Sequence, residues 1–162
     1  MVNVTWNVWD EPVTRETVEE VAKKLAVTFL EDYIKCAMAN HGGHVNPHLF
    51  QVEEKERVFG TFLSYIIEDS EYIVEVYHDY KETLPAQVVP IAFDPAGNLL
   101  CFDYKNHEDD PIVVFWEHEN AAEKEMLMHE EGLTAEQAEE RARENLFYVA
   151  DSFTDFLGKL YE

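Results

Sequence analysis

Apolar positions recur with helical spacing in the first quarter of the chain. After Thr14, apolar residues recur every three or four positions as far as Leu25, with glutamates and lysines between them, and this pattern predicts an amphipathic helix. Thr14 is a good N-cap for it, because a threonine hydroxyl can accept a bond from a free N–H of the first turn. The same spacing predicts a second helix over residues 30–39, which the Asn-His-Gly-Gly sequence at 40–43 ends.

The middle of the chain changes to β-branched and aromatic runs, which predict strands between residues 49 and 67 and again at 88–93, 99–102 and 112–116. The last two runs are apolar on both faces, so we expect central strands that helices cover on both sides. The Asp-Pro-Ala-Gly sequence at 94–97 predicts a tight hairpin turn, because proline presets φ and glycine accepts a positive φ.

Four further helical patterns complete a mixed α and β domain. They cover residues 71–84, 120–132, 134–145 and 151–161. The third opens with Thr134 and Gln137, which are spaced as in a capping box, and a short strand at 146–149 precedes the last. A chain of 162 residues, 46% of them hydrophobic, has enough material for one core, so we expect a single domain over residues 1–162.

The charge balance is strongly acidic, with 34 acidic against 12 basic side chains and a net charge of -22. Protonating all seven histidines would still leave fifteen negative charges. Nucleic acids and anionic membranes are bound by lysine and arginine, so both are disfavoured as partners. The same field attracts a basic protein and speeds its association.

Two cysteines and the N-terminal residues predict where the protein acts. Cys36 and Cys101 lie in apolar surroundings and form no CxxC pair, so free buried thiols are expected, as in a reducing compartment. The first residues lack the basic and apolar segments of a secretion signal, and eighteen consecutive apolar residues occur nowhere. We therefore expect a cytoplasmic protein.

Three histidines, His41, His44 and His48, lie within eight residues of a loop. Imidazoles that converge can bind zinc, but this spacing matches no established zinc pattern, and we favour a solvated turn over a metal site. The chain has no G-x-S-x-G elbow and no phosphate-binding glycine loop, and Cys101 lies in an apolar strand that disfavours a thiolate. We expect no catalysis and no cofactor.

Acidic residues bracket the strand predicted at 112–116. They are Glu108, Asp109 and Asp110 before it, and Glu117 and Glu119 after it. A run of charges is most often a solvated face, and the alternative here is a surface for a partner.

Four stretches, read in order, resemble the SUKH superfamily, which includes fungal cell-wall-assembly regulators and many bacterial toxin-immunity proteins. The matching residues are Asp32, Tyr33, Asn40, Gly42 and Gly43 around the second helix, Gly97, Asn98 and Asp103 in the hairpin, Trp116 and His118 at the end of the next strand, and Ala150, Ser152, Phe153 and Phe156 near the end of the chain. The chain departs from the family at Leu30, where a proline is common, and in residues 119–144, which we interpret as an acidic helical insertion.

The resemblance implies an α+β fold with a central, mostly antiparallel sheet flanked by helices, and a role in binding rather than catalysis. Many bacterial members are thought to neutralise a toxin, often a nuclease, encoded beside them. A nuclease binds phosphate groups with lysine and arginine, so its substrate-binding surface is basic. We therefore expect a cytoplasmic immunity protein that binds a basic toxin domain. The predicted contact residues are Asp103, Tyr104, Glu108, Asp109, Asp110, Trp116, Glu117 and Glu119.

The sequence also permits two alternatives. The first is a regulatory scaffold that binds an endogenous protein or a small ligand in a pocket near Tyr33, Asn40 and Trp116. The second is a metal-dependent enzyme that uses the loop histidines His41, His44 and His48. The sequence leaves both monomer and dimer open.

Overall fold

The structure of the protein, a computed structural model, describes residues 3–162. Both predicted N-terminal helices are present, as α1 (Arg15–Lys24) and α2 (Glu31–Asn40). The Thr14 hydroxyl caps α1 by accepting a hydrogen bond from the Thr17 N–H at 3.2 Å. Gly42, with a φ of +73°, turns the chain after α2 as its position after the helix predicted.

The core of the fold is a five-stranded antiparallel sheet in sequential strand order. Its strands are β5 (Thr61–Phe62), β6 (Val88–Phe93), β7 (Leu99–Asp103), β8 (Ile112–Trp116) and β9 (Leu146–Ala150). The predicted turn joins β6 to β7, with Gly97 at a φ of +88°. Two ribbons lie beside the sheet, made of β1 (Thr5–Asn7) with β2 (His44–Asn46) and of β3 (Leu49–Val52) with β4 (Lys55–Val58). The α+β architecture with an antiparallel sheet is confirmed.

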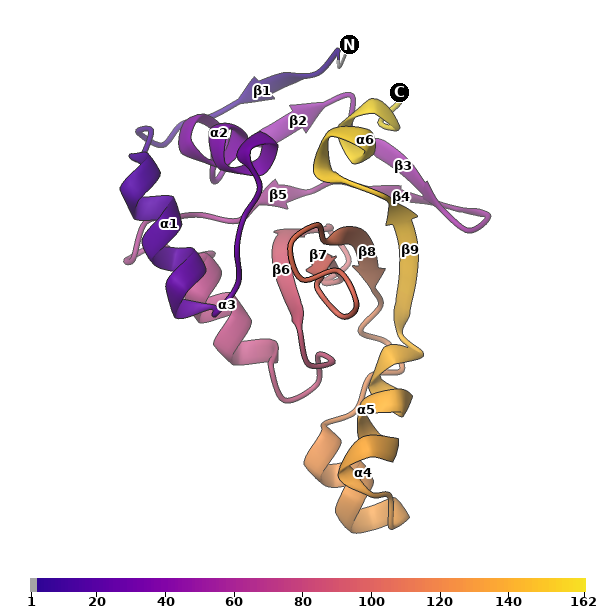
Figure 1. Ribbon diagram of the computed structural model, residues 1–162. Helices are drawn as coiled ribbons and strands as arrows, with labels where there is room; N and C mark the ends of the chain where they lie inside the picture. The colour runs from indigo at the N-terminus through magenta and orange to yellow at the C-terminus, as the bar shows by residue number, and fades with distance from the viewer. Residues whose placement is uncertain (1–2) are drawn as a thin grey trace.

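Helices cover both faces of the sheet, as the apolar strands predicted (Figure 1). On one face Phe102 of β7 packs against Tyr33 of α2 and Phe153 of α6 (Phe153–Gly158), at ring-centroid distances of 5.1 and 6.3 Å. Trp116 of β8 lies opposite Leu99, which is three residues before Phe102 in β7. Because side chains alternate along a strand, Trp116 points to the face opposite to that of Phe102. There it packs against Tyr80, the last residue of α3 (Ile73–Tyr80), at 5.6 Å.

The acidic segment forms a helical hairpin that projects from the sheet (Figure 1). It consists of α4 (Lys124–Glu131) and α5 (Ala135–Arg143), and the predicted capping box is present, with both bonds between Thr134 and Gln137. Glu139 of α5 accepts from Lys124 Nζ of α4 at 2.8 Å, which joins the two helices, and from the Ala86 N–H at 2.9 Å, which ties the hairpin to the segment before β6. Whether this segment is an insertion stays a prediction.

Both cysteines are free thiols. Cys101 is fully buried in β7, and burial raises the pKa of its thiol well above the ordinary value. Burial raises the pKa of Cys36 in α2 to about 12, with a smaller opposing effect from the Asn40 side chain, whose amide lies 3.6 Å from the sulfur. Both thiols are therefore protonated and unreactive near neutral pH. Within residues 3–162, no helix has the length and apolar character to cross a membrane.

Candidate binding surface

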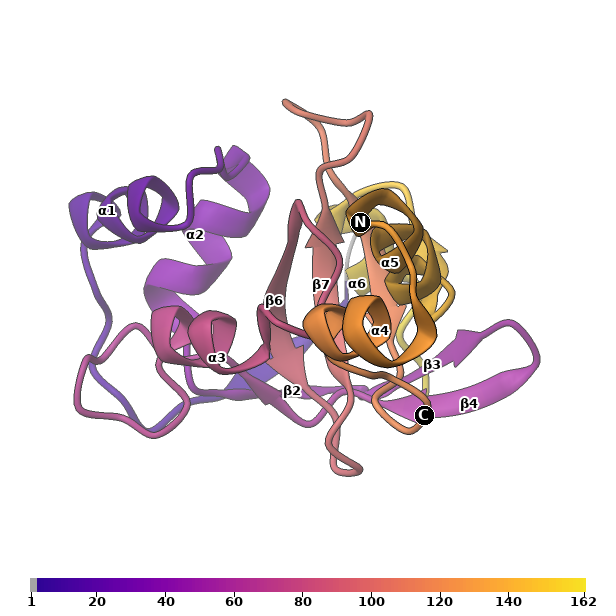
Figure 2. The same ribbon diagram turned by 90° about the horizontal axis from the view of Figure 1, so that it is seen from below.

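The loop between β7 and β8, residues 104–111, carries three consecutive carboxylates. Glu108, Asp109 and Asp110 are exposed, and none of them forms an ion pair with another residue of the described range 3–162. Figure 2 shows this loop leaving one end of β7, while the β6–β7 turn leaves the other end. The loop is therefore a free acidic projection at one end of the sheet.

Asp103 and Tyr104 hold the base of this loop and are themselves buried. Asp103 is 4% exposed and accepts from the Lys105 N–H at 3.1 Å, while its other carboxylate oxygen pairs with the Arg143 guanidinium of α5. The Tyr104 hydroxyl donates to the Thr28 carbonyl at 2.9 Å, and burial raises the pKa of this hydroxyl. These two side chains position the loop from below rather than reaching solvent.

A cavity of about 540 Å³ opens beside the loop. Its walls come from Tyr104, Glu108 and Asp109 and from the α1–α2 connection over residues 25–28, with Val89 among the apolar lining. Two carboxylates thus lie next to an apolar surface. A lysine or arginine side chain could place its charged group against the carboxylates and its methylene chain against the apolar surface.

Non-glycine residues with positive φ surround this cavity. Ala26 and Gln87 line it at φ values of +58° and +68°, and Asn106 lies in the adjoining loop at +65°. Such backbone conformations are costly for alanine and glutamine, and they persist only where the surrounding structure enforces them.

The other predicted contact residues lie at the far end of β8 or inside the molecule. Glu117 pairs with Arg57 of β4 at 3.2 Å, and Glu119 is exposed beyond it. Trp116 is 2% exposed, on the face that Tyr80 covers. The structure brings Tyr104, Glu108 and Asp109 together around one cavity, but it does not bring all eight predicted residues onto one surface.

The residues of the alternative pocket lie apart. Tyr33 is buried under the α2 face of the sheet, where its hydroxyl lies 2.6 Å from the Tyr65 hydroxyl. Trp116 lies on the opposite face, and Asn40 is the last residue of α2. A common ligand pocket for these three stays a prediction that the geometry does not favour.

The three loop histidines also separate. His41 is fully buried, with Nδ1 accepting from the Tyr65 N–H at 3.2 Å and Nε2 donating to the Glu11 carbonyl at 2.8 Å. Both of its ring nitrogens are therefore occupied. His44 and His48 line a groove elsewhere. Within the described residues, 3–162, no group of three or more histidine, cysteine, aspartate or glutamate side chains is placed to hold a metal ion.

Sequence reasoning missed several partners of the family motif residues. His118 donates its N–H to the Asn98 side chain at 3.0 Å, and its Nε2 donates to the Ala96 carbonyl at 2.8 Å. Asp94 accepts from the Asn98 side chain at 2.9 Å. These bonds join the β6–β7 turn to the end of β8, so this motif maintains the hairpin. A turn aspartate four residues before an asparagine was the available signal.

Comparison with protein-family models identifies the relationship. The model of the SMI1 / KNR4 family (SUKH-1) matches residues 12–159, which is nearly the whole chain. The chain belongs to this SUKH family. The suspected resemblance is thereby confirmed. Comparison with curated proteins found no match for this SUKH protein.

SUKH proteins are generally non-catalytic and bind partner proteins, and their roles are consistent with immunity or with cell-wall regulation. In this member, the acidic β7–β8 loop places exposed carboxylates beside a cavity of about 540 Å³.

Proposed function

We propose that this SUKH protein is a non-catalytic immunity protein that neutralises a basic, nuclease-type toxin in the cytoplasm. The observation that carries the proposal is the exposed run Glu108–Asp110 beside a cavity of about 540 Å³. A nuclease holds phosphates with lysine and arginine, and the same side chains would meet the carboxylates of the loop.

The predicted contact residues would have separate roles in this binding. Glu108 and Asp109 would take the cationic heads of partner side chains, and the apolar cavity wall near Val89 would take their stems. Asp103 and Tyr104 would act as positioning residues, because they are buried and fix the base of the loop. Glu119, at the other end of β8, would add to steering at long range.

The test uses a variant that removes three charges and a control that removes three elsewhere. The loop variant is Glu108→Gln with Asp109→Asn and Asp110→Asn. The control neutralises Glu125, Glu130 and Glu136, which are exposed on the α4–α5 hairpin and, within residues 3–162, pair with no cation. Both variants therefore carry the same net charge.

Tagged wild type and both variants capture partners from a lysate of the native host, and mass spectrometry identifies them. We expect wild type and control to retain a basic toxin domain that the loop variant loses, and co-expression of wild type and control to protect cells from it. Capture of a cell-wall protein in place of a toxin would support the regulatory role, which the family match also permits. Equal capture of one toxin by all three proteins would contradict the proposed surface.

A further inference from the structure

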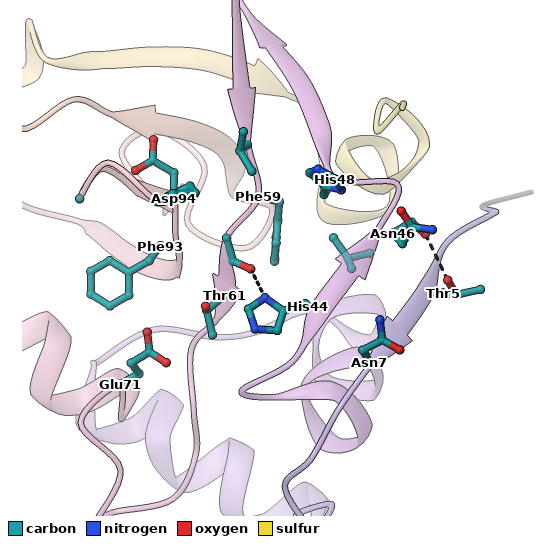
Figure 3. Close-up of a pocket in the computed structure, with 15 residues that line it drawn as sticks. Thr5, Asn7, His44, Asn46, His48, Phe59, Thr61, Glu71, Phe93 and Asp94 are labelled. Atoms are coloured by element: carbon teal, nitrogen blue, oxygen red, sulfur yellow. Dashed lines mark hydrogen bonds between the residues drawn. The ribbon is translucent and has the colours of Figure 1, made fainter.

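A second recess lies away from the acidic loop, at the turn end of the β6–β7 hairpin. It has a volume of about 870 Å³ and lies between the β1–β2 ribbon, the segment that joins β4 to β5, and the hairpin turn (Figure 3). Of the family motif residues, Gly97 of the turn lines this recess. The residues of the proposed toxin surface line a different cavity. We call it the ribbon groove.

The ribbon groove forms where two backbone segments separate. At one side the Phe62 N–H donates to the Gly43 carbonyl at 3.0 Å, and at the other the Phe59 N–H donates to the His48 carbonyl at 2.7 Å. Between these two bonds, residues 44–47 and 60–61 are not paired with each other as strands. β2 pairs with β1 in one sheet, and β5 pairs with β6 in another. The groove is thus built into the backbone path.

His44 spans the gap between the segments. Its Nδ1 lies 2.7 Å from the Gly60 carbonyl, and because a carbonyl only accepts, Nδ1 carries the proton. In the neutral ring Nε2 remains a hydrogen-bond acceptor. Trp9 lies next to the groove rather than in its lining, where it packs edge-on against this ring with centroids 5.9 Å apart and is 79% exposed. Tryptophan is highly buried on average in folded proteins, and it is among the residues enriched in binding hot spots.

Three further polar groups line the groove without internal partners. The carboxamides of Asn7 and Asn46 and the carboxylate of Glu71 form no side-chain hydrogen bond or ion pair within the described part of the chain, residues 3–162 (Figure 3). Glu71 forms no ion pair within residues 3–162, and burial raises its pKa, with a further upward effect from Asp69 and an opposing one from His44.

We propose that the ribbon groove is a second recognition site, which binds an extended segment of a partner polypeptide that carries a lysine or arginine. Each carboxamide offers two N–H donors and one oxygen acceptor, which match the C=O and N–H groups of an extended backbone. Glu71 pairs with the cationic head, and Trp9 packs against the side-chain stem. The net charge of -22 favours a basic segment over an acidic one.

The experiment uses a phage-displayed library of random linear peptides as the probe. Four immobilised proteins are compared: wild type, a groove variant (Trp9→Ala with Glu71→Gln), a control variant (Met126→Ala with Glu130→Gln) and the neutralised β7–β8 loop variant. Met126 and Glu130 are exposed on α4, so the control loses the same kinds of group from another surface. Circular dichroism and the melting temperature establish that each variant is folded.

We expect wild type, control and loop variant to enrich the same peptides with lysine or arginine, and the groove variant to bind them at least about tenfold more weakly. In NMR titrations such a peptide should shift the Trp9 indole and the Asn7 and Asn46 side-chain signals. Absence of enrichment, equal binding by the groove variant, or peptides without a basic residue would overturn the inference. Peptides lost only by the loop variant would also overturn it, and would instead support the toxin surface.

Discussion

Asp103 is the residue that joins the acidic loop to the rest of the molecule. Asp103 is 4% exposed. Its carboxylate accepts a hydrogen bond from the Lys105 N–H at the start of the loop and pairs with the Arg143 guanidinium of the α4–α5 hairpin. A buried carboxylate is tolerated only with such partners, because its desolvation is costly. One side chain therefore couples β7, the loop and α5.

Replacing Asp103 with alanine should lower the free energy of unfolding by about 3 kcal/mol, because Arg143 is left without its counter-charge. Urea denaturation measures the change. Glu119→Ala removes an exposed carboxylate at the other end of β8 and should change stability by less than about 0.5 kcal/mol. Similar small effects for both variants would show that the Asp103–Arg143 pair does not support the fold.

Glu139 makes the attachment of the hairpin sensitive to pH. Burial acts to raise its pKa, but the Lys124 ammonium and the Ala86 N–H outweigh this effect, so the pKa is lowered from its ordinary 4.5. A lowered folded-state pKa means that the stabilisation is complete above about pH 4.5 and is lost as the pH falls through the folded-state pKa. Glu139→Gln should therefore cost about 1 kcal/mol at pH 7 and little in stronger acid.

Urea denaturation of wild type and Glu139→Gln at several pH values measures this difference. Glu140→Gln, one position along the same helix and exposed, is the matched control and should show no such pH dependence. A difference between wild type and Glu139→Gln that grows as the pH falls would contradict the assignment.

At the scale of elements, the β6–β7 turn depends on one buried asparagine. Asn98 donates to Asp94 and accepts from the His118 N–H, so it links the turn to the end of β8. Asn98→Ala removes the partners of Asp94 Oδ2 and of the His118 N–H, while Asp94 Oδ1 keeps its two backbone donors. It should cost about 2 kcal/mol, with faster hydrogen exchange at the His118 amide. Asn120→Ala, an exposed position after β8, serves as the control. Unchanged exchange at His118 would refute the link.

Elements with local signals were predictable from the sequence. The helix at Thr14 and the capping box at Thr134 are fixed by residues three apart, and both are present in the structure. The pairing of Asp103 with Arg143 connects residues forty positions apart, so no local pattern could reveal it. The same holds for the ribbon groove, whose lining comes from separate segments that only the fold brings together. Burial of Trp116 also depends on a distant residue, Tyr80.

Across the whole molecule, exposed carboxylates occur on helices α1 to α6, on β4 and in several loops, and their mutual repulsion opposes the compact state. Raising the ionic strength from about 10 to about 150 mM shortens the Debye length from about 30 to about 8 Å and screens this repulsion. The Tm should therefore rise with sodium chloride over this range, as measured by circular dichroism. A falling Tm would mean that attractive ion pairs outweigh repulsion.

We propose that the β7–β8 loop presents its charge to a basic partner. The association rate of the purified toxin domain should be measured with wild type, loop variant and control variant at about 50 and about 500 mM salt. We predict a rate that falls steeply with salt for wild type and control, and that is slower and less salt-dependent for the loop variant. Identical rates and salt dependence for the loop and control variants would contradict the account.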